Sequence, residues 1–253
     1  MPQFFIKKEL TEGRTVEIRG SDAHHIKDVL RLTPGDWLVL SDGRGNSFMC
    51  TLTDLKTRQV SARVDRRILR PEGTTPPTIA IAMIRSERLE WAVQKCVELG
   101  ARHIIPFNSA RTVRKSSAAD GGRRIKRLRK IAEEAAKQSG LPLMPAIDPP
   151  KEFEEVCARL PEYDPAILLF EGERKDDLKS VWGKRMSGRR GKLPKAPLVI
   201  IGPEGGFTPR EVEMFKSNGA VTASLGLQIL RVETAAVAVM TICQYELGNL
   251  GAS

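Results

Sequence analysis

Residues 198–211 combine a strand, a glycine loop and a helix start in one run. They read LVIIGPEGGFTPRE, so an apolar strand leads into a loop that holds three glycines. Thr208 is a suitable N-cap, Pro209 fits the first helical position, and Glu211 completes a capping box with Thr208. We therefore expect the loop to present backbone N–H groups at a helix N-terminus, which is a common place for ligand binding.

The residue types in this loop narrow the class of ligand. The loop has neither the Lys and Ser/Thr of a Walker loop nor the GxGxxG spacing, and no acidic residue ends the next strand to hold a ribose. Glu204 would repel a phosphate, whereas it could accept hydrogen bonds from amino or hydroxyl groups or lie near a sulfonium cation. A polyphosphate ligand is therefore disfavoured, and a simple turn with a solvent-facing Glu204 is the alternative.

Two further loops are expected beside the glycine loop. Ser224-Leu225-Gly226 ends the next predicted strand and leads into an apolar stretch up to Leu230, and Phe170-Glu171-Gly172 ends an earlier strand. The carboxyl ends of parallel strands meet at one edge of a sheet, where ligands of open α/β folds bind. An apolar stretch suits a flat adenine ring better than a phosphate. The three loops together predict a pocket.

A parallel sheet is needed to bring these loops together, and residues 78–253 have the pattern of an α/β domain. Apolar strands are expected at 79–84, 103–107, 166–170, 198–201 and 221–225, with helices between them. The first of these helices carries one apolar face and stops at Gly100. Residues 186–195 are expected to form a mobile loop.

Residues 1–70 have a different pattern, in which short strands and turns surround one helix. Strands are expected at 15–18, 37–40, 48–52 and 59–64, and a helix at 21–32 with Ser21 or Asp22 as its N-cap. This pattern is typical of a small β-barrel. The proline-rich residues 71–77 cannot continue a strand ladder and are predicted to link the two domains.

Positive charge is concentrated in three segments of the chain. Residues 111–130 hold nine Lys/Arg against one Asp, residues 183–195 hold six against none, and residues 58–70 hold five against one Asp, although the whole chain carries only +10. Such segments are the expected footprint of phosphate contacts, so nucleic acid is the leading predicted partner. Solvated basic surfaces are the alternative.

Composition disfavours several other classes of protein. Four widely spaced Cys without a CxxC pair, together with three His, predict free thiols, no disulfide framework and no metal site. Residues 1–10 lack the apolar region of a signal peptide, and the apolar stretch 234–245 is too short to cross a bilayer. We expect a cytoplasmic protein with no membrane segment. Residues 234–243 are apolar around the whole helix circumference, which predicts a homodimer or a buried core helix.

Several stretches taken together resemble one family. IGPEGGF at 201–207 and LGLQILRVETA at 225–235 are similar to the signature motifs of the RsmE-type 16S rRNA (uracil-N3)-methyltransferases of the SPOUT class. Residues 88–100, 111–113 and 24–31 also resemble family motifs, so the likeness spans nearly the whole chain. Leu141 and Val232 depart from the pattern, in which Arg and Thr are usual.

This resemblance implies a fold, a reaction and partners. The N-terminal barrel would be PUA-like and help to hold RNA, and the C-terminal parallel sheet would carry a trefoil knot whose threaded loops bind S-adenosylmethionine in a homodimer. Sequence patterns alone predict an ordinary open sheet, because threaded chains are rare. The implied reaction is methylation of N3 of a uridine in 16S rRNA, either as naked RNA or in the small ribosomal subunit.

The loops, the basic segments and the resemblance together assign residues to roles. Cofactor contacts are expected from Phe170, Glu171, Ile201, Gly202, Gly205, Gly206, Leu225, Gly226, Ile229, Leu230, Thr234 and Ala235. RNA contacts are expected from Arg31, Arg111, Arg114, Arg123 and Arg124. The roles of His24 and His25 stay open between RNA contact and structure.

The expected chemistry requires charge to develop on the uracil ring, because N3 carries a proton at neutral pH. A fixed cation would stabilise that anion, and Arg231 is the candidate. Glu204 is the candidate proton acceptor. A purely structural ion pair between Arg231 and Glu233 is the alternative.

Two other functions compete with this one. A non-catalytic, ribosome-associated RNA-binding protein would explain the basic segments but would leave the pocket loops without a purpose. A nucleotide-dependent metabolic enzyme conflicts with the missing ribose acid and with the segregated charge. Cofactor binding by the isolated chain separates the first alternative from the methyltransferase.

Overall fold

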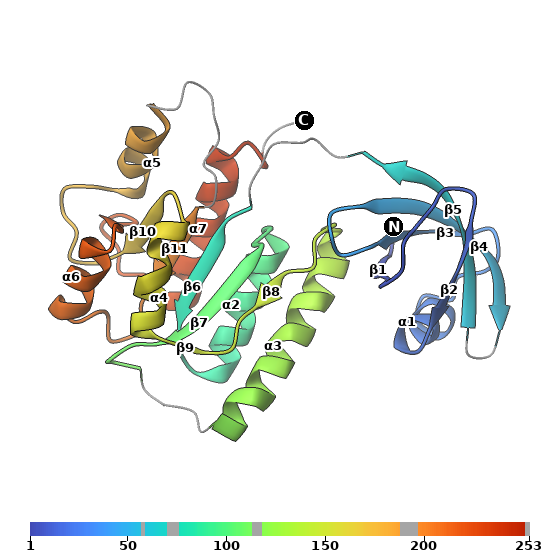
Figure 1. The fold of residues 1–253 in the computed structure, drawn as a ribbon, viewed down its shortest axis with the longest axis horizontal. Coiled ribbons are helices and arrows are strands. Elements are labelled where there is room, and N and C mark those ends of the chain that lie inside the picture. Colours follow the sequence, from blue (N-terminus) through green and yellow to red (C-terminus); the bar gives the residue numbers. More distant parts are fainter. Residues whose placement is uncertain (57–58, 70–75, 113–117, 188–196, 251–253) are drawn as a thin grey trace. The chain divides into compact units, whose positions relative to one another are not determined.

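The computed structural model describes residues 1–56, 59–69, 76–112, 118–187 and 197–250, without the side chains of 118–120 and 185–187. The chain forms two compact units: Met1–Glu72 with Ala136–Met144, and Gly73–Ala135 with Pro145–Ser253. Figure 1 shows a strand-rich first unit and a second unit in which helices surround a sheet. The predicted linker at 71–77 and the predicted mobile loop at 186–195 lie largely outside the described residues.

The first unit is built on a curled, five-stranded sheet in the order β1-β3-β4-β5-β2. Its strands are β1 (Gln3–Phe5), β2 (Thr15–Arg19), β3 (Trp37–Ser41), β4 (Ser47–Lys56) and β5 (Gln59–Ile68). Alternate side chains of the longer strands face inward, so that Leu38, Cys50 and Val60 are buried in one apolar core. The four predicted strands are present, whereas β1, which lies parallel to β3, was not predicted.

The helix predicted at 21–32 is shorter and differently capped. Helix α1 (Ser21–His24) runs directly into the π-helical turn η1 (His25–Val29), and its N-cap is Gly20 rather than Ser21 or Asp22. The Asp22 carboxylate accepts from Lys137 Nζ at 2.9 Å, so it is not used as a cap. Arg31 has φ of 54°, a left-handed conformation in which a helix cannot continue.

Residues 136–144 belong by their contacts to the first unit, although the expected boundary placed them in the second. Lys137 pairs with Asp22, and Gln3 Nε2 donates to the backbone carbonyl of Leu141 at 2.5 Å. Leu141, which departs from the family pattern, therefore makes this contact through its backbone.

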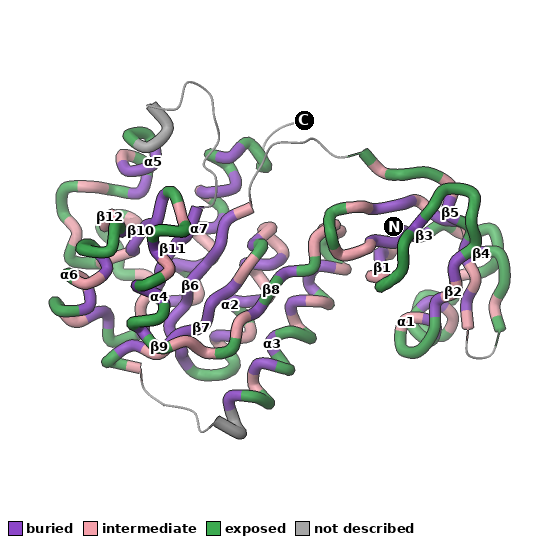
Figure 2. The backbone as a smooth tube through the Cα atoms, in the orientation of Figure 1, coloured by how far each residue is buried: buried purple, intermediate pink, exposed green. Residues whose placement is uncertain are grey.

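The second unit contains a sheet of parallel strands in the order β12-β10-β11-β6-β7-β8, with β9 also paired to β7. The strands are β6 (Thr78–Ala82), β7 (His103–Asn108), β8 (Ala146–Ile147), β9 (Lys151–Glu152), β10 (Ala166–Leu169), β11 (Leu198–Ile201) and β12 (Val221–Ala223). Strands β6 and β11 are buried along their whole length, as expected of a sheet covered on both faces, and Figure 2 shows the same burial along the centre of the unit. The parallel sheet predicted from the sequence is confirmed.

Helices cover this sheet. They are α2 (Ser86–Glu98), α3 (Ala118–Ser139), α4 (Phe153–Arg159) with the short 3-10 helix η2 (Leu160–Glu162), α5 (Leu178–Ser187), α6 (Pro209–Ser217) and α7 (Val232–Glu246). Helices α4 and α6 share one core with the sheet, where the rings of Phe153 and Phe215 meet edge to face at 4.7 Å. Helix α7 contacts β11 and α2. The trefoil knot implied by the resemblance stays a prediction.

Candidate functional site

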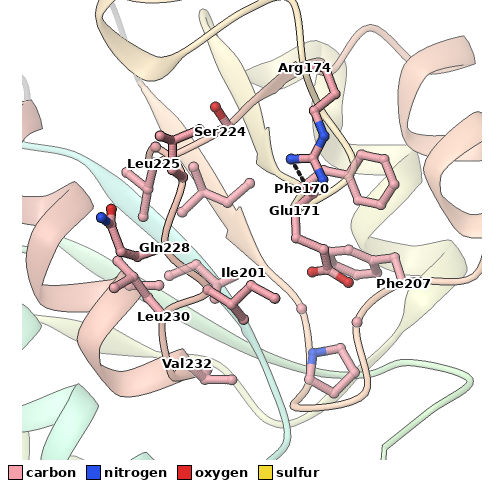
Figure 3. A pocket seen from close by; sticks show the side chains of 18 residues that line it. Phe170, Glu171, Arg174, Ile201, Phe207, Ser224, Leu225, Gln228, Leu230 and Val232 are labelled. Atoms are coloured by element: carbon pink, nitrogen blue, oxygen red, sulfur yellow. Dashed lines mark hydrogen bonds between the residues drawn. The ribbon is translucent and has the colours of Figure 1, made fainter.

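A cleft opens where the carboxyl ends of β12, β10 and β11 lie side by side. Figure 3 shows Leu225, Gln228 and Leu230 on one side of this cleft and Glu171 and Phe207 on the other. The lining residues come from the three predicted loops and the start of α7: Leu169, Phe170, Glu171, Arg174, Ile201, Gly202, Pro203, Gly206, Phe207, Ser224, Leu225, Gly226, Leu227, Gln228, Ile229, Leu230, Val232 and Ala235. The predicted convergence of these loops is therefore present.

The glycine loop after β11 is fixed by the capping box at the start of α6. Thr208 N donates to Glu211 Oε2 at 2.8 Å, and Glu211 N donates to Thr208 Oγ1 at 3.2 Å. Ala110 N also donates to Glu211 Oε1 at 2.8 Å, which ties the segment after β7 to the same carboxylate. Burial raises the pKa of Glu211, but the donors from Ala110 and Thr208 outweigh it and hold this pKa below its ordinary value.

Two glycines of the loop lie where a side chain would not fit. A Cβ atom on Gly202 would lie 2.7 Å from the ring of Phe207, and that ring is buried against Phe107 and Phe215. Gly206 has φ of 68°, and a Cβ there would lie 2.5 Å from Glu171 Oε1. Both positions therefore require glycine for the loop to keep its place beside Phe207 and Glu171.

The loop after β12 supplies an apolar wall. Leu227 and Ile229 are 95% and 88% exposed, and both line the cleft. Exposed apolar side chains of this size are typical of a surface that binds an apolar ligand or a protein partner.

Polar groups line the opposite side of the cleft. Arg174 Nη1 donates to the backbone carbonyl of Glu171 at 3.0 Å, which fixes the turn after β10 and leaves the Glu171 carboxylate facing Gly206. A cleft with one apolar wall, one carboxylate and accessible loop backbone suits a ligand that combines a heterocycle with amino and hydroxyl groups.

The structure gathers most of the predicted cofactor residues into the cleft. Gly205 and Thr234 are not among the lining residues, whereas the other ten are. Gly205 lies on the outer side of the loop, where its carbonyl accepts from Arg111 Nη1 at 2.8 Å. Arg174 and Gln228 line the cleft without having been predicted: Arg174 follows the predicted loop at 170–172, and Gln228 lies inside the motif at 225–235 but was given no role. Val232, a departure from the family pattern, also lines it.

Arg231 and Glu204 flank the cleft but are not in its lining. Arg231 is the N-cap of α7, and within the described residues its exposed side chain forms no hydrogen bond or ion pair. The alternative in which it pairs with Glu233 is therefore not what the structure shows. Glu204 Oε1 instead accepts from Arg88 Nη1, a residue at the start of α2.

The residues predicted to contact RNA differ in their surroundings. Arg31 is exposed at the end of η1, and Arg123 is exposed on α3. Arg124 is half-buried and donates to the carbonyl of Ile84, and burial lowers the pKa of its guanidinium, partly offset by the charge of Glu90. Arg114 lies outside the described residues, as does most of the predicted basic segment 183–195.

The described residues contain neither a metal-binding group nor a membrane-spanning helix. In that part of the chain, His, Cys, Asp and Glu form no group of three that could hold a metal ion. None of the helices described is long and apolar enough to cross a membrane.

Comparison with known proteins places this geometry among RNA methyltransferases. A family model described as an RNA methyltransferase domain matches residues 71–244, and one described as an RNA methyltransferase PUA domain matches residues 18–65. The chain is 32% identical to the ribosomal RNA small subunit methyltransferase E of Bacillus subtilis, over 97% of both chains, and 29% identical to that of Mycobacterium tuberculosis, over 92% of this chain and 87% of the relative.

A solved structure of a methyltransferase also matches this fold. The crystal structure of a ribosomal RNA small subunit methyltransferase E from Neisseria gonorrhoeae, bound to S-adenosyl methionine, matches with a TM-score of 0.84 at 26% identity. The match covers 97% of each chain, so both units of the fold are included.

Proposed function

The chain belongs to the RNA methyltransferase family, and we propose that it transfers the methyl group of S-adenosylmethionine to N3 of a uridine in the 16S RNA of the small ribosomal subunit. The observation that carries this proposal is the cleft formed by three loops at the carboxyl ends of β10, β11 and β12. The relatives named as small subunit methyltransferases and the neighbour bound to S-adenosyl methionine support it.

The cleft residues fit this cofactor. The apolar wall at 225–230 would cover the adenine ring, and the backbone around Gly202 and Gly206 would lie against the cofactor where a Cβ atom has no room. The Glu171 carboxylate would accept from hydroxyl or amino groups. When bound, the cofactor supplies an electrophilic methyl group on a sulfonium.

The chain's own residues must then make uracil N3 nucleophilic. Arg231 carries a guanidinium that is exposed and unpaired among the described residues, and we assign it to the oxygen atoms of the ring, where negative charge develops as N3 loses its proton. Glu204 is the proton acceptor predicted from the sequence, and its carboxylate pairs with Arg88.

We assign the chain to a homodimer on the basis of α7. Val237, Ala238 and Ile242 are partly exposed on this apolar helix, and the exposed Tyr245 lies one turn beyond them. A second copy would cover this apolar stripe. RNA would be held by basic side chains of α3 and by the first unit, whose sequence matches an RNA methyltransferase PUA domain.

Transfer of a labelled methyl group tests the proposed function. The protein is incubated with S-adenosylmethionine that carries a labelled methyl group and with small ribosomal subunits that lack the modification, with large subunits as the control. Label should enter the small-subunit RNA alone. Binding of the small subunits without transfer of label would favour the non-catalytic RNA-binding protein instead.

A further inference from the structure

Glu233, near the start of α7, has a carboxylate oxygen that accepts no hydrogen bond from the described part of the chain. Its side chain is 15% exposed, and its Oε2 atom is buried and has no partner among the described residues. A buried carboxylate oxygen that accepts no hydrogen bond costs free energy, so such an atom is retained where a ligand supplies the donor. The unmethylated N3 of uracil carries such a donor.

The hollow around Glu233 is lined by side chains that can hold a base by stacking and hydrogen bonding. Glu87, Arg88 and Trp91 of α2 line it together with Glu233. The Trp91 side chain is 45% exposed, so its indole offers a face on which a base can stack. Val232 and Ala235, on either side of Glu233 in α7, line the cofactor cleft. The start of α7 therefore serves both the cofactor cleft and this hollow.

Arg88 distinguishes the two carboxylates that could accept the proton. Its Nη1 donates to Glu204 Oε1, and its Nε lies 3.9 Å from Glu233 Oε1. One cation thus stands between two carboxylates. Glu204 has the more exposed side chain, at 30%, and is hydrogen-bonded to Arg88, whereas Glu233 keeps a buried oxygen for a ligand. A carboxylate oxygen that is shielded from water and accepts no hydrogen bond from a neighbouring cation is the better placed of the two to take a proton.

We infer that Glu233, and not Glu204, accepts the proton of uracil N3, with the ring stacked on Trp91; this inference rests on the proposed function. Glu233 Oε2 takes the hydrogen, and the electron pair left on N3 forms the bond to the methyl carbon. The bond between that carbon and sulfur breaks, and its electron pair stays on sulfur. The products are N3-methyluridine, S-adenosylhomocysteine and a protonated Glu233, which returns its proton to water.

Single-turnover rates of Glu233→Gln, Glu204→Gln and Glu213→Gln test this assignment. Glu213→Gln is the control, because Glu213 is exposed on α6 and lines neither this hollow nor the cofactor cleft. Glu233→Gln should lower the rate at least about a hundredfold at neutral pH, and rising pH should restore part of it, since general-base catalysis contributes about 10²- to 10⁴-fold. Glu213→Gln should stay within about threefold, and Glu204→Gln should lose less than Glu233→Gln.

A binding measurement keeps this test independent of activity. In a Trp37→Phe background Trp91 is the exposed tryptophan, because Trp182 is buried. With S-adenosylhomocysteine present, RNA that carries the target uridine should quench Trp91 fluorescence more strongly than the same RNA with N3-methyluridine, which has no N3 proton to donate. Equal quenching by the two RNAs would overturn the inference.

Further outcomes separate this inference from the proposed function. Calorimetry should give Glu233→Gln a wild-type Kd for S-adenosylmethionine within about threefold, and Glu233→Asp, which keeps the carboxylate, should retain more of the rate than Glu233→Gln. The inference would be overturned if Glu233→Gln kept more than a tenth of the wild-type rate or lost cofactor binding. It would also be overturned if Glu204→Gln lost more of the rate than Glu233→Gln, or if Glu233→Gln and Glu233→Asp lost equal shares of it. If the wild-type protein methylates no small subunits, the proposed function itself fails.

Discussion

A Cβ atom on Gly206 would lie 2.5 Å from Oε1 of Glu171, so the loops after β10 and β11 meet in the cleft without room for a side chain between them. The Glu171 carboxylate can rotate away from such an atom, but it would then leave its place in the cofactor cleft. The backbone of Gly206 cannot relax as easily, because its φ of 68° is unfavourable for residues with a Cβ atom.

The substitution Gly206→Ala should therefore weaken cofactor binding at least about tenfold and cost about 1 kcal/mol of stability. Calorimetric titration with S-adenosylmethionine and thermal unfolding measure the two effects. Gly205→Ala is the matched control in the same loop, because a Cβ there would lie 3.4 Å from Cβ of Arg111 and its φ is not in the left-handed region. Similar affinities of the two variants for S-adenosylmethionine would contradict the claim that Gly206 has no room for a Cβ atom.

Arg231→Ala should lower kcat at least about tenfold while the affinity for S-adenosylmethionine stays within a few-fold. The reason is that a cation near the uracil oxygens acts on the charge that develops in the transition state, whereas the cofactor cleft does not include Arg231. Higher pH should restore part of the rate, because N3 then loses its proton more easily. A variant with normal kcat, or one whose sole defect is cofactor binding, removes Arg231 from this role.

The basic residues of α3 should divide into two groups. Lys126 and Lys130 are exposed, whereas Arg124 donates to the carbonyl of Ile84, Arg127 pairs with Glu90 at 2.8 Å, and Arg129 Nη2 donates to the carbonyl of Ile147 at 2.9 Å. Replacing both lysines by alanine should reduce the slope of log RNA affinity against log salt concentration by about two at most.

Arg124→Ala should instead lower the melting temperature and leave that salt slope nearly unchanged, because its guanidinium is committed to the protein backbone. This revises the prediction from the sequence, which placed Arg124 with Arg123 in the RNA interface. A slope that changes with Arg124 but not with the two lysines would restore the original assignment.

Glu211→Gln should destabilise the protein by about 1 kcal/mol at neutral pH, because an amide nitrogen would face the donors of Thr208. The pKa of Glu211 in the folded chain lies below its ordinary value of 4.5, so the carboxylate stabilises the fold above that pH, and this contribution is lost as the pH falls through the lowered pKa. Unfolding free energies of both proteins from pH 7 to pH 3 should therefore converge toward acid. A constant difference in unfolding free energy from pH 7 to pH 3 would contradict a stabilising role of the ionised Glu211 carboxylate.

Light scattering at micromolar concentration should give twice the 28.0 kDa of one chain. Ile242→Glu places a charge on the apolar side of α7 and should shift the mass toward that of one chain, since a buried unpaired charge is costly. Thr241→Glu is a nearby exposed control in the same helix. A monomeric wild-type protein would leave the apolar side of α7 without the proposed partner.

Short patterns along the chain were enough to predict the parts of the site that depend on local chemistry. Strand β11 begins and ends where its apolar run does, and Thr208, Pro209 and Glu211 form the predicted capping box. These features depend on neighbours a few residues away, so the sequence contains the whole explanation. The convergence of the loops after β10, β11 and β12 followed from parallel pairing, which the apolar runs also indicate.

Features that depend on distant partners could not be predicted in this way. Asp22 was predicted as a cap, but the structure pairs it with Lys137. Arg124 was predicted to contact RNA from its basic neighbours alone, which do not show that its guanidinium donates to the carbonyl of Ile84. Among the residues that the structure describes, Oε2 of Glu233 has no hydrogen-bond partner, and this follows from the packing of α7 against α2, which no local pattern reports. Sequence reasoning therefore located the cofactor loops, whereas its assignment of Glu204 as the proton acceptor stays a prediction beside the inference for Glu233.

The identity of the methylated atom is the most direct test of the account. Small subunits that lack the modification are incubated with the protein and S-adenosylmethionine, and the RNA is digested and mapped by mass spectrometry. We predict one new methyl group, at N3 of a uridine in the 16S RNA, and none when S-adenosylhomocysteine replaces the methyl donor. A methyl group on a ribose, on a carbon atom or on another base, or no methyl group at all, would contradict it.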